Sequence, residues 1–161
     1  MIPSDETLTP KNRDLVTLTT DILVFNPETT DILLIERTKP PFMNKLVLPG
    51  GHVENDDGEI KVSCAREAEE EVGLKVDSDL LDLFDILYGD ENRDPRVKRS
   101  VSIVYIYIAD QEEMQSCVAG SDAKAIQIKN LFQIKEDEIG FDHWQCISKL
   151  ANEMIDININ E

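Results

Sequence analysis

The sequence predicts an α/β protein in which a mixed β-sheet packs between helices. Runs of β-branched and apolar residues, separated by turn residues, recur through most of the chain and are typical of strands. Helical patterns stand in the middle of the chain and near its end, so helices can cover the sheet. The 161 residues are enough for one core. We therefore expect a single domain over residues 1–161, with an irregular segment at 1–14.

The first two strands are expected to form a hairpin. Leu15 to Phe25 is rich in β-branched and apolar residues and predicts a strand. Asn26 to Thr30 follows as a turn, because Asn-Pro sequences start turns. Ile32 to Glu36 is the returning strand. It ends at Lys39-Pro40-Pro41, since proline donates no hydrogen bond to a neighbouring strand.

A short strand and a helix come next. Leu46 to Leu48 predicts a strand that stops at a Pro49-Gly50-Gly51 turn. The two glycines allow φ angles closed to other residues and expose backbone amides and carbonyls to a ligand or metal. A helix is then expected from Ile60 to Val72, and Gly73 stands where a left-handed C-cap would lie.

The second half of the chain continues with strands and ends in a helix. Strands are expected at Leu80–Tyr88, Val101–Ala109 and Ala125–Ile128, with a charged loop at 89–100 and a polar connection at Gln111–Ser121. Asp142 can cap the last helix through its side chain. That helix has an apolar stripe at i, i+3, i+4 and i+7, which predicts a core-facing side. The stripe consists of Ile147, Leu150, Ala151 and Met154.

Charge and cysteine content exclude several classes of protein. A net charge of −17, from 33 acids and 16 bases, opposes binding to nucleic acid or anionic membranes. The N-terminus has no signal-peptide pattern, and the longest apolar run, Val101 to Ala109 with Ser102 inside it, is too short to cross a bilayer. Three cysteines without paired spacing indicate reduced thiols. We expect a cytoplasmic protein that binds neither nucleic acid nor membrane.

Three glutamates of the middle helix predict a metal site. Glu67, Glu70 and Glu71 stand at i, i+3 and i+4, so their side chains share one helix face. Their repulsion costs a few tenths of a kcal/mol per pair, and a hard cation such as Mg²⁺, which prefers oxygen ligands, would remove it. A glutamate-rich helix alone is more often a solvated charged face. The Gly-Gly turn and the Arg-Glu spacing favour the metal site.

The stretch from Gly51 to Leu74 resembles the signature box of the Nudix hydrolases. That box reads Gly, five residues, Glu, seven residues, then Arg-Glu-U-x-Glu-Glu-x-Gly-U, with U apolar. Arg66 to Leu74 meets its second half, with a small Ala68 at the first U. Fourteen residues separate Gly51 from Arg66, where the pattern has thirteen, so one residue is inserted in the Asn55–Gly58 loop. Either Asp57 or Glu59 then replaces the first box glutamate.

The flanking sequence is similar to the ADP-ribose pyrophosphatase branch of this family. The similarity rests on Ile32–Gly51, Arg93–Arg96, Gly120–Ala123 and Phe141–His143, and it extends over most of the chain from residue 15 to 150. The branch usually has a histidine shortly after Asp-Pro-Arg. Here the sequence reads Val97-Lys98-Arg99-Ser100, so that histidine is lost or replaced.

The resemblance implies an α/β/α sandwich and hydrolysis of a nucleoside diphosphate linked to another group X. It implies Mg²⁺ as the cofactor, with Mn²⁺ as an alternative, because a divalent ion neutralises the diphosphate and lowers the pKa of a bound water. The implied metal ligands are Glu67, Glu70 and Glu71, with a backbone carbonyl of Gly50 or Gly51.

Further residues have expected roles around these ligands. Arg66 acts beside them in catalysis and can hold the box loop by pairing with Asp57 or Glu59. One of the helix glutamates, or Glu112, Glu113 or Asp122, serves as general base. The bases expected to bind substrate are Arg37, Arg93 and Arg96, with Arg99 as a further local base.

Three functions are open at this point. The leading one is hydrolysis of ADP-ribose to AMP and ribose 5-phosphate. The second is pyrophosphohydrolysis of a nucleoside triphosphate, including an oxidised one. The third is a module that binds ADP-ribose without cleaving it. Related regulators carry a DNA-binding tail after the Nudix domain, and we expect none after Ile157–Glu161. The expected partner is a small-molecule nucleotide, and a homodimer is an expected assembly.

Overall fold

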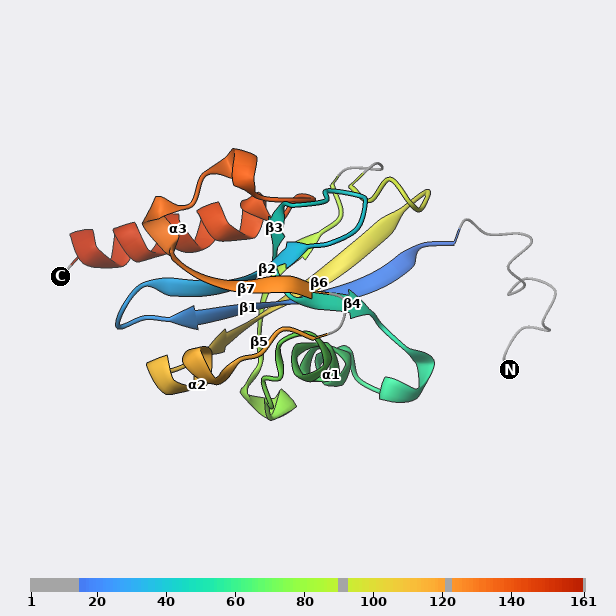
Figure 1. Ribbon diagram of the computed structural model, residues 1–161, viewed down its shortest axis with the longest axis horizontal. Coiled ribbons are helices and arrows are strands. Elements are labelled where there is room, and N and C mark those ends of the chain that lie inside the picture. The colour runs from blue at the N-terminus through green and yellow to red at the C-terminus, as the bar shows by residue number, and fades with distance from the viewer. Residues whose placement is uncertain (1–14, 90–92, 121–122, 161) are drawn as a thin grey trace.

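The computed structural model describes residues 15–89, 93–120 and 123–160. Seven strands form one mixed sheet. Helix α3 (Trp144–Ile159) covers one face of the sheet, whereas α1 (Ile60–Val72) and α2 (Gln111–Ser116) lie on the other (Figure 1). The predicted α/β/α sandwich is therefore confirmed. In this part of the chain no helix is long and apolar enough to cross a membrane.

Strand β1 (Thr17–Asn26) lies at the centre of the sheet. It forms the predicted hairpin with the antiparallel β2 (Asp31–Arg37), and it pairs in parallel with β6 (Ser100–Ile108) from Thr17 to Phe25. This parallel pair makes the sheet mixed. β5 (Asp82–Leu87) pairs antiparallel with β6, and β7 (Ala123–Asn130) pairs antiparallel with β2.

β1 and β2 pair directly only beside the turn that joins them. Farther from the turn, the segment that contains two short strands lies between β1 and β2. β3 (Leu46–Val47) pairs with β2, and β4 (Gly50–His52) pairs with β1. The predicted turn at Pro49-Gly50-Gly51 is thus wrong in part, because both glycines belong to a strand. Neither has a positive φ. Their need for glycine arises from close packing, which is described with the site below.

Helix α1 matches its predicted bounds, and Gly73 caps it in the left-handed region at φ 68°. Its buried face consists of small or compact residues, Ser63, Cys64, Ala68 and Val72. Cys64, Ala68 and Val72 pack with apolar side chains of β1 and β2 in one core cluster. Small side chains let a helix approach a sheet closely. The backbone of α1 therefore lies near β1 and β4. The glutamates of α1 line the same cavity as the glycines of β4.

Helix α3 packs on the opposite face through the predicted stripe, together with Leu23 and Leu34 of the sheet and Leu48, which lies between β3 and β4. Its predicted cap is wrong: His143 occupies the N-cap position, and no side-chain cap bond is present. The carboxylate of Asp142 binds Arg93 instead. Asp142 therefore forms an ion pair with a distant arginine and does not cap the helix.

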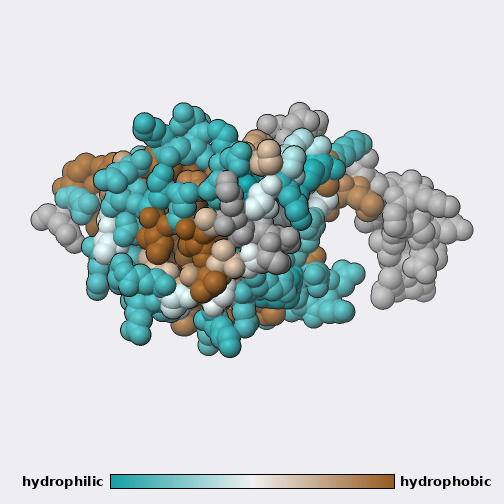
Figure 2. Space-filling model, viewed as in Figure 1, coloured by the Kyte–Doolittle hydropathy of each residue, from teal (hydrophilic) through white to brown (hydrophobic). Residues whose placement is uncertain are grey.

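The polar connection predicted at Gln111–Ser121 contains α2. Asp110 and Glu113 form a reciprocal capping box at its start, and Met114 is buried beneath it. Short 3₁₀ helices complete the described structure at Asn55–Asp57, Ser78–Leu80, Leu131–Gln133 and Glu136–Glu138. Hydrophilic side chains cover most of the face shown in Figure 2, with an apolar patch near its centre.

Candidate active site

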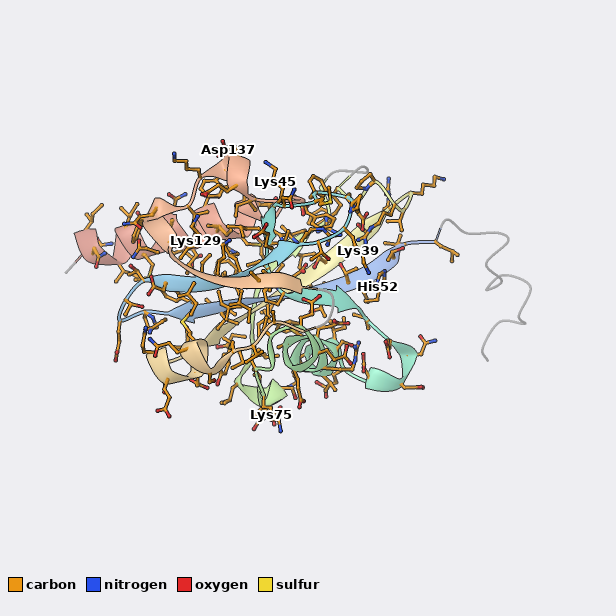
Figure 3. All side chains as sticks on the ribbon, viewed as in Figure 1. Lys39, Lys45, His52, Lys75, Lys129 and Asp137 are labelled. Carbon is orange, nitrogen blue, oxygen red and sulfur yellow. The ribbon has the colours of Figure 1, made fainter. Side chains whose placement is uncertain are left out.

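A cavity of about 490 Å³ opens where β3 and β4 lie between β1 and β2. Acids, bases and apolar side chains all line it. The acids are Asp21, Glu54, Glu67, Glu70, Glu71 and Asp94, the bases include Arg37, Lys39, Arg93 and Arg96, and the apolar members include Ile35, Val47, Leu48 and Phe141. Lys39 and His52, which also line it, lie on the same side of the view in Figure 3. The predicted metal ligands and the arginines Arg37, Arg93 and Arg96 line this cavity, whereas Arg66 lies beside it and binds two of the lining glutamates.

The two glycines of β4 bring backbone against the acids of α1. A Cβ atom on Gly51 would lie 2.4 Å from the carboxylate carbon of Glu67, and one on Gly50 would lie 2.2 Å from the carbonyl oxygen of Thr20. Any side chain at either position would therefore displace its neighbours. The amide of Gly50 donates a hydrogen bond to Oε2 of Glu71 at 2.8 Å. Contact with the backbone of β1, rather than an unusual φ, requires glycine at position 50, whereas a side chain at position 51 would displace the carboxylate of Glu67.

Two glutamates of α1 are partly buried and lack full charge compensation. Burial raises the pKa of Glu71 to about 7, and the neighbouring Glu67 and Asp21 add to this, against the hydrogen bond from Gly50. Burial also raises the pKa of Glu67, although Arg66 partly offsets it. A cation placed among these carboxylates would favour their ionised form. Oxygen donors of this kind suit a hard divalent ion.

Arg66 joins the helix to the loop that precedes it. Its Nε and Nη2 donate to the two carboxylate oxygens of Asp57, each at 2.9 Å, and Nη2 also donates to the carbonyl of His52. Ser63 donates a further bond to Asp57 at 2.6 Å. These bonds hold the pKa of Asp57 well below its usual range. The partner of Arg66 is thus Asp57, and Glu59 instead stands at the N-cap position of α1.

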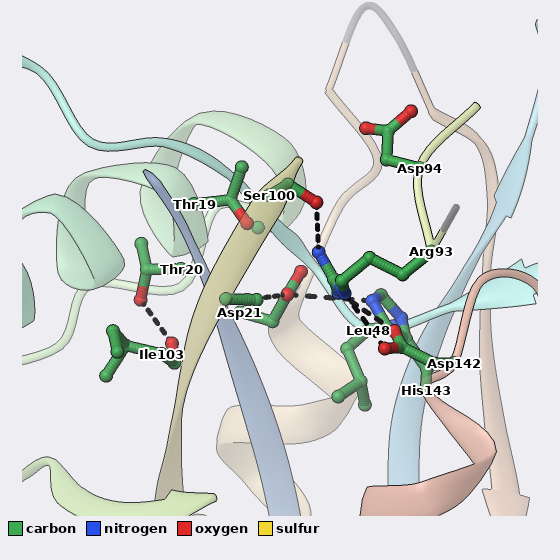
Figure 4. A network of polar contacts seen from close by, with 12 residues as sticks. Thr19, Thr20, Asp21, Leu48, Arg93, Asp94, Ser100, Ile103, Asp142 and His143 are labelled. Atoms are coloured by element: carbon green, nitrogen blue, oxygen red, sulfur yellow. Dashed lines mark hydrogen bonds and ion pairs between the residues drawn. The ribbon is translucent and has the colours of Figure 1, made fainter. Parts of the chain in front are cut away.

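The predicted substrate-binding arginines have different surroundings. Nε of Arg37 donates to the carbonyl of Pro41 at 2.6 Å, and among the described residues no carboxylate forms a close ion pair with Arg37, although Asp94 and Glu71 lie near enough to act on its charge. Arg96 forms a two-bond pair with Asp94. Arg93 is buried and donates to both oxygens of Asp142, each at 2.8 Å, and to Ser100 at 2.9 Å (Figure 4). Arg37 therefore has the guanidinium most available to an anion, whereas that of Arg93 is engaged within the fold.

A second polar network was missed by the sequence analysis. Asp21 lies on the central strand and is almost fully buried, where it accepts a hydrogen bond from Ser102 and lies 3.5 Å from Nε2 of His143 (Figure 4). Nδ1 of His143 accepts the amide proton of Leu48 at 3.0 Å. Although burial raises the pKa of Asp21, His143, Ser102 and Arg93 together lower it below the ordinary value. A lone aspartate within an apolar strand was the available signal.

Comparison with known proteins settles the family. A model of the NUDIX domain matches residues 16–150. The chain belongs to the NUDIX family. No curated protein gives a significant match to this Nudix chain.

Solved structures of several other proteins share its fold. A MutT/nudix family protein from Enterococcus faecalis is 26% identical, with a TM-score of 0.73; the match covers 89% of this chain and 64% of that one. The NUDIX domain of Shewanella oneidensis NrtR, crystallised with ADP ribose, is 22% identical, with a TM-score of 0.76 and coverage of 94% and 98%. A bifunctional NMN adenylyltransferase/ADP ribose pyrophosphatase from Francisella tularensis, complexed with AMP and a Mn ion, is 25% identical, with a TM-score of 0.73. That match covers 91% of this Nudix chain but only 44% of the Francisella protein.

The box of this Nudix protein is not arranged around a closed metal site. In the described ranges, no three acidic, histidine or cysteine side chains come together as a cluster that could hold a metal ion. Nη1 of Arg66 binds Glu67 at 3.0 Å and Glu70 at 3.2 Å, while Glu71 accepts from Gly50. All three glutamates are therefore engaged with protein groups in this structure.

The candidate bases outside the Nudix box lie elsewhere or are not described. Glu112 and Glu113 belong to α2 and do not line the cavity. Glu113 accepts a hydrogen bond from the Tyr107 hydroxyl at 2.6 Å and caps its own helix. Asp122 lies outside the described residues. The extra residue of the box loop is accommodated in a 3₁₀ turn, followed by Gly58 at φ 79°.

Proposed function

We propose that this Nudix protein is a metal-dependent pyrophosphatase acting on a nucleoside diphosphate linked to another group. The observation that carries the proposal is the cavity itself, which places partly buried glutamates of α1 in one space with Arg37. A diphosphate needs cations around it, and the chain as a whole carries −17. Its anion must therefore be received locally, by an ion on the acids and by the arginine.

The residues of the box have separate tasks in this proposal. Glu67, Glu70 and Glu71 would hold Mg²⁺ or Mn²⁺, helped by the Gly51 carbonyl. When bound, the ion neutralises the diphosphate and lowers the pKa of a coordinated water. Arg66 keeps the box loop on the helix through Asp57, and one of the helix glutamates accepts the proton of the attacking water.

ADP-ribose is the substrate that we propose first, with AMP and ribose 5-phosphate as products. The Francisella protein is a bifunctional enzyme whose second activity is an ADP ribose pyrophosphatase, and the Shewanella NUDIX domain binds ADP ribose. Arg37 is proposed to receive the diphosphate, with Arg96 beside it and Arg93 in a supporting place. The cytoplasmic location, the homodimer and the single domain remain predictions.

Glu70→Gln tests the metal assignment. The Glu70 side chain is 58% exposed, so the substitution should keep the fold. We expect turnover of ADP-ribose with Mg²⁺ or Mn²⁺ to fall at least 100-fold, on the order of the loss of one electrostatic catalytic group. Glu69→Gln is the matched control, because Glu69 is exposed on the same helix and does not line the cavity. Wild-type turnover in Glu70→Gln would show that the metal assignment is wrong.

A binding module without hydrolysis is the second candidate. It is favoured by Arg66, whose guanidinium binds Glu67 and Glu70 where an ion would need them. Binding of ADP-ribose with no product after prolonged incubation with Mg²⁺ or Mn²⁺ would support it. Chromatography of products also separates a triphosphate substrate, which yields a monophosphate and pyrophosphate, from ADP-ribose, which yields AMP.

A further inference from the structure

Two phenylalanines form an aromatic surface that continues outward from the cavity. The rings of Phe42 and Phe141 lie 4.7 Å apart between centroids, tilted by 51°. Phe141 lines the cavity, and Phe42 is 37% exposed. Both have left-handed backbones, with φ of 60° for Phe42 and 52° for Phe141. Bulky residues rarely adopt this region, and such strain clusters at functional sites.

The chain holds these rings in place from behind. Gly140 donates its amide to the carbonyl of Leu46 at 2.9 Å. A Cβ atom on Gly140 would lie 3.0 Å from Cβ of Phe42 and 3.0 Å from Cγ1 of Val47. The segment before Phe141 is therefore packed tightly against the loop that carries Phe42. The two aromatic residues form one surface, although they are 99 positions apart in the sequence.

Cationic and apolar groups surround the rings. The guanidinium carbon of Arg37 lies 5.0 Å from the centroid of Phe141, and that of Arg96 lies 5.7 Å from it. Ile35 and Val47 contribute an apolar part of the cavity lining. Aromatic faces and planar guanidinium groups both stack on flat π systems. The acids of α1 lie in the same cavity but present no such surface.

We infer that Phe42 and Phe141 form a subsite that binds the planar heterocyclic base of a nucleotide, adjacent to Arg37, which receives the diphosphate. The inference rests on the proposed function, in which the acids and their ion receive the diphosphate of the same molecule. The alternative is that Phe42 only covers the core. A covering role would be served by any apolar side chain and would not require an exposed ring on strained backbone.

Binding measured without metal tests the subsite separately from hydrolysis. Calorimetric titration in EDTA compares AMP, which has a base, with ribose 5-phosphate, which lacks one. Phe42→Leu keeps an apolar side chain and removes the ring, and Phe42→Tyr keeps the ring. Phe132→Leu is the matched control, because Phe132 is 49% exposed and does not line the cavity. Circular dichroism confirms that each variant is folded.

We expect Phe42→Leu to weaken AMP binding roughly tenfold, the usual range for one stacked base. Ribose 5-phosphate binding should stay unchanged, and Phe42→Tyr and Phe132→Leu should bind AMP as wild type does. An unchanged AMP affinity in Phe42→Leu, or an equal loss for both ligands, overturns the base subsite even if the protein hydrolyses ADP-ribose. Conversely, AMP binding that depends on Phe42 supports the subsite even if no diphosphate is hydrolysed, a result that would overturn the proposed function alone.

Discussion

Replacing Glu71 with glutamine tests whether α1 holds a partly buried carboxylate ready for a cation. Glutamine keeps a side-chain oxygen that can accept the 2.8 Å hydrogen bond from Gly50, but it cannot ionise. Burial raises the pKa of Glu71 from 4.5 to about 7. This difference of about 2.5 units corresponds to at most about 3 kcal/mol, at roughly 1.36 kcal/mol per unit.

The sign of the effect follows from the direction of the pKa shift. The folded-state pKa of Glu71 lies above the unfolded-state value, so ionisation disfavours the folded protein. The stability associated with the protonated carboxyl is complete below pH 4.5 and is lost as the pH rises through about 7. In EDTA, Glu71→Gln should therefore be more stable than wild type by up to about 3 kcal/mol at pH 8.5, and by less than about 1 kcal/mol at pH 5.

Urea denaturation measures this difference, with the fluorescence of Trp144 as the probe. Glu69→Gln is the control, because Glu69 is exposed on the same helix and should show no pH-dependent gain. Added Mg²⁺ should stabilise wild type at pH 8.5 by ligand linkage and stabilise Glu71→Gln much less. An equal stability of variant and wild type at pH 8.5 would refute the argument that Glu71 is buried without a compensating charge.

Two further predictions concern the arginines. Asp57→Asn should lower turnover roughly tenfold, because it removes the carboxylate that pairs with Arg66. Glu59→Gln should leave turnover unchanged. Steady-state kinetics measure both variants, and equal turnover in the two would contradict this prediction. Arg93→Ala should lower the free energy of unfolding by about 3 kcal/mol, because it leaves the partly buried carboxylate of Asp142 unpaired. Arg37→Ala should leave the free energy of unfolding unchanged and raise the KM for ADP-ribose roughly tenfold. Thermal melting and kinetics of both variants check this pair, and equal melting temperatures would contradict the structural role of Arg93.

Elements set by neighbouring residues could be predicted from the sequence. The hairpin of β1 and β2 follows from apolar runs around Asn-Pro, and α1 follows from its periodic small residues and the capping Gly73. The three glutamates share a helix face because of their spacing alone. The same local reasoning contains the signal for α2, since Asp110 and Glu113 have the capping-box spacing, and that signal was overlooked.

Contacts between distant segments were decided only by the tertiary structure. Asp142 has the chemistry of a helix cap, yet it pairs with Arg93, which is 49 positions away. Counting residues along the box leaves Asp57 and Glu59 as equivalent candidates for pairing with Arg66. The fold of the box loop brings Asp57, and not Glu59, into contact with Arg66.

The sequence by itself determined the fold class and the helix that carries the glutamates, because periodicity and capping depend on residues within a few positions of each other. The tertiary structure decided how buried those glutamates are, which arginine has no carboxylate partner in the described structure, and that Phe42 and Phe141 meet. These properties depend on which parts of the chain are brought together. A charged group or an aromatic ring interacts with the groups that lie near it in space. Position along the chain does not determine which groups those are.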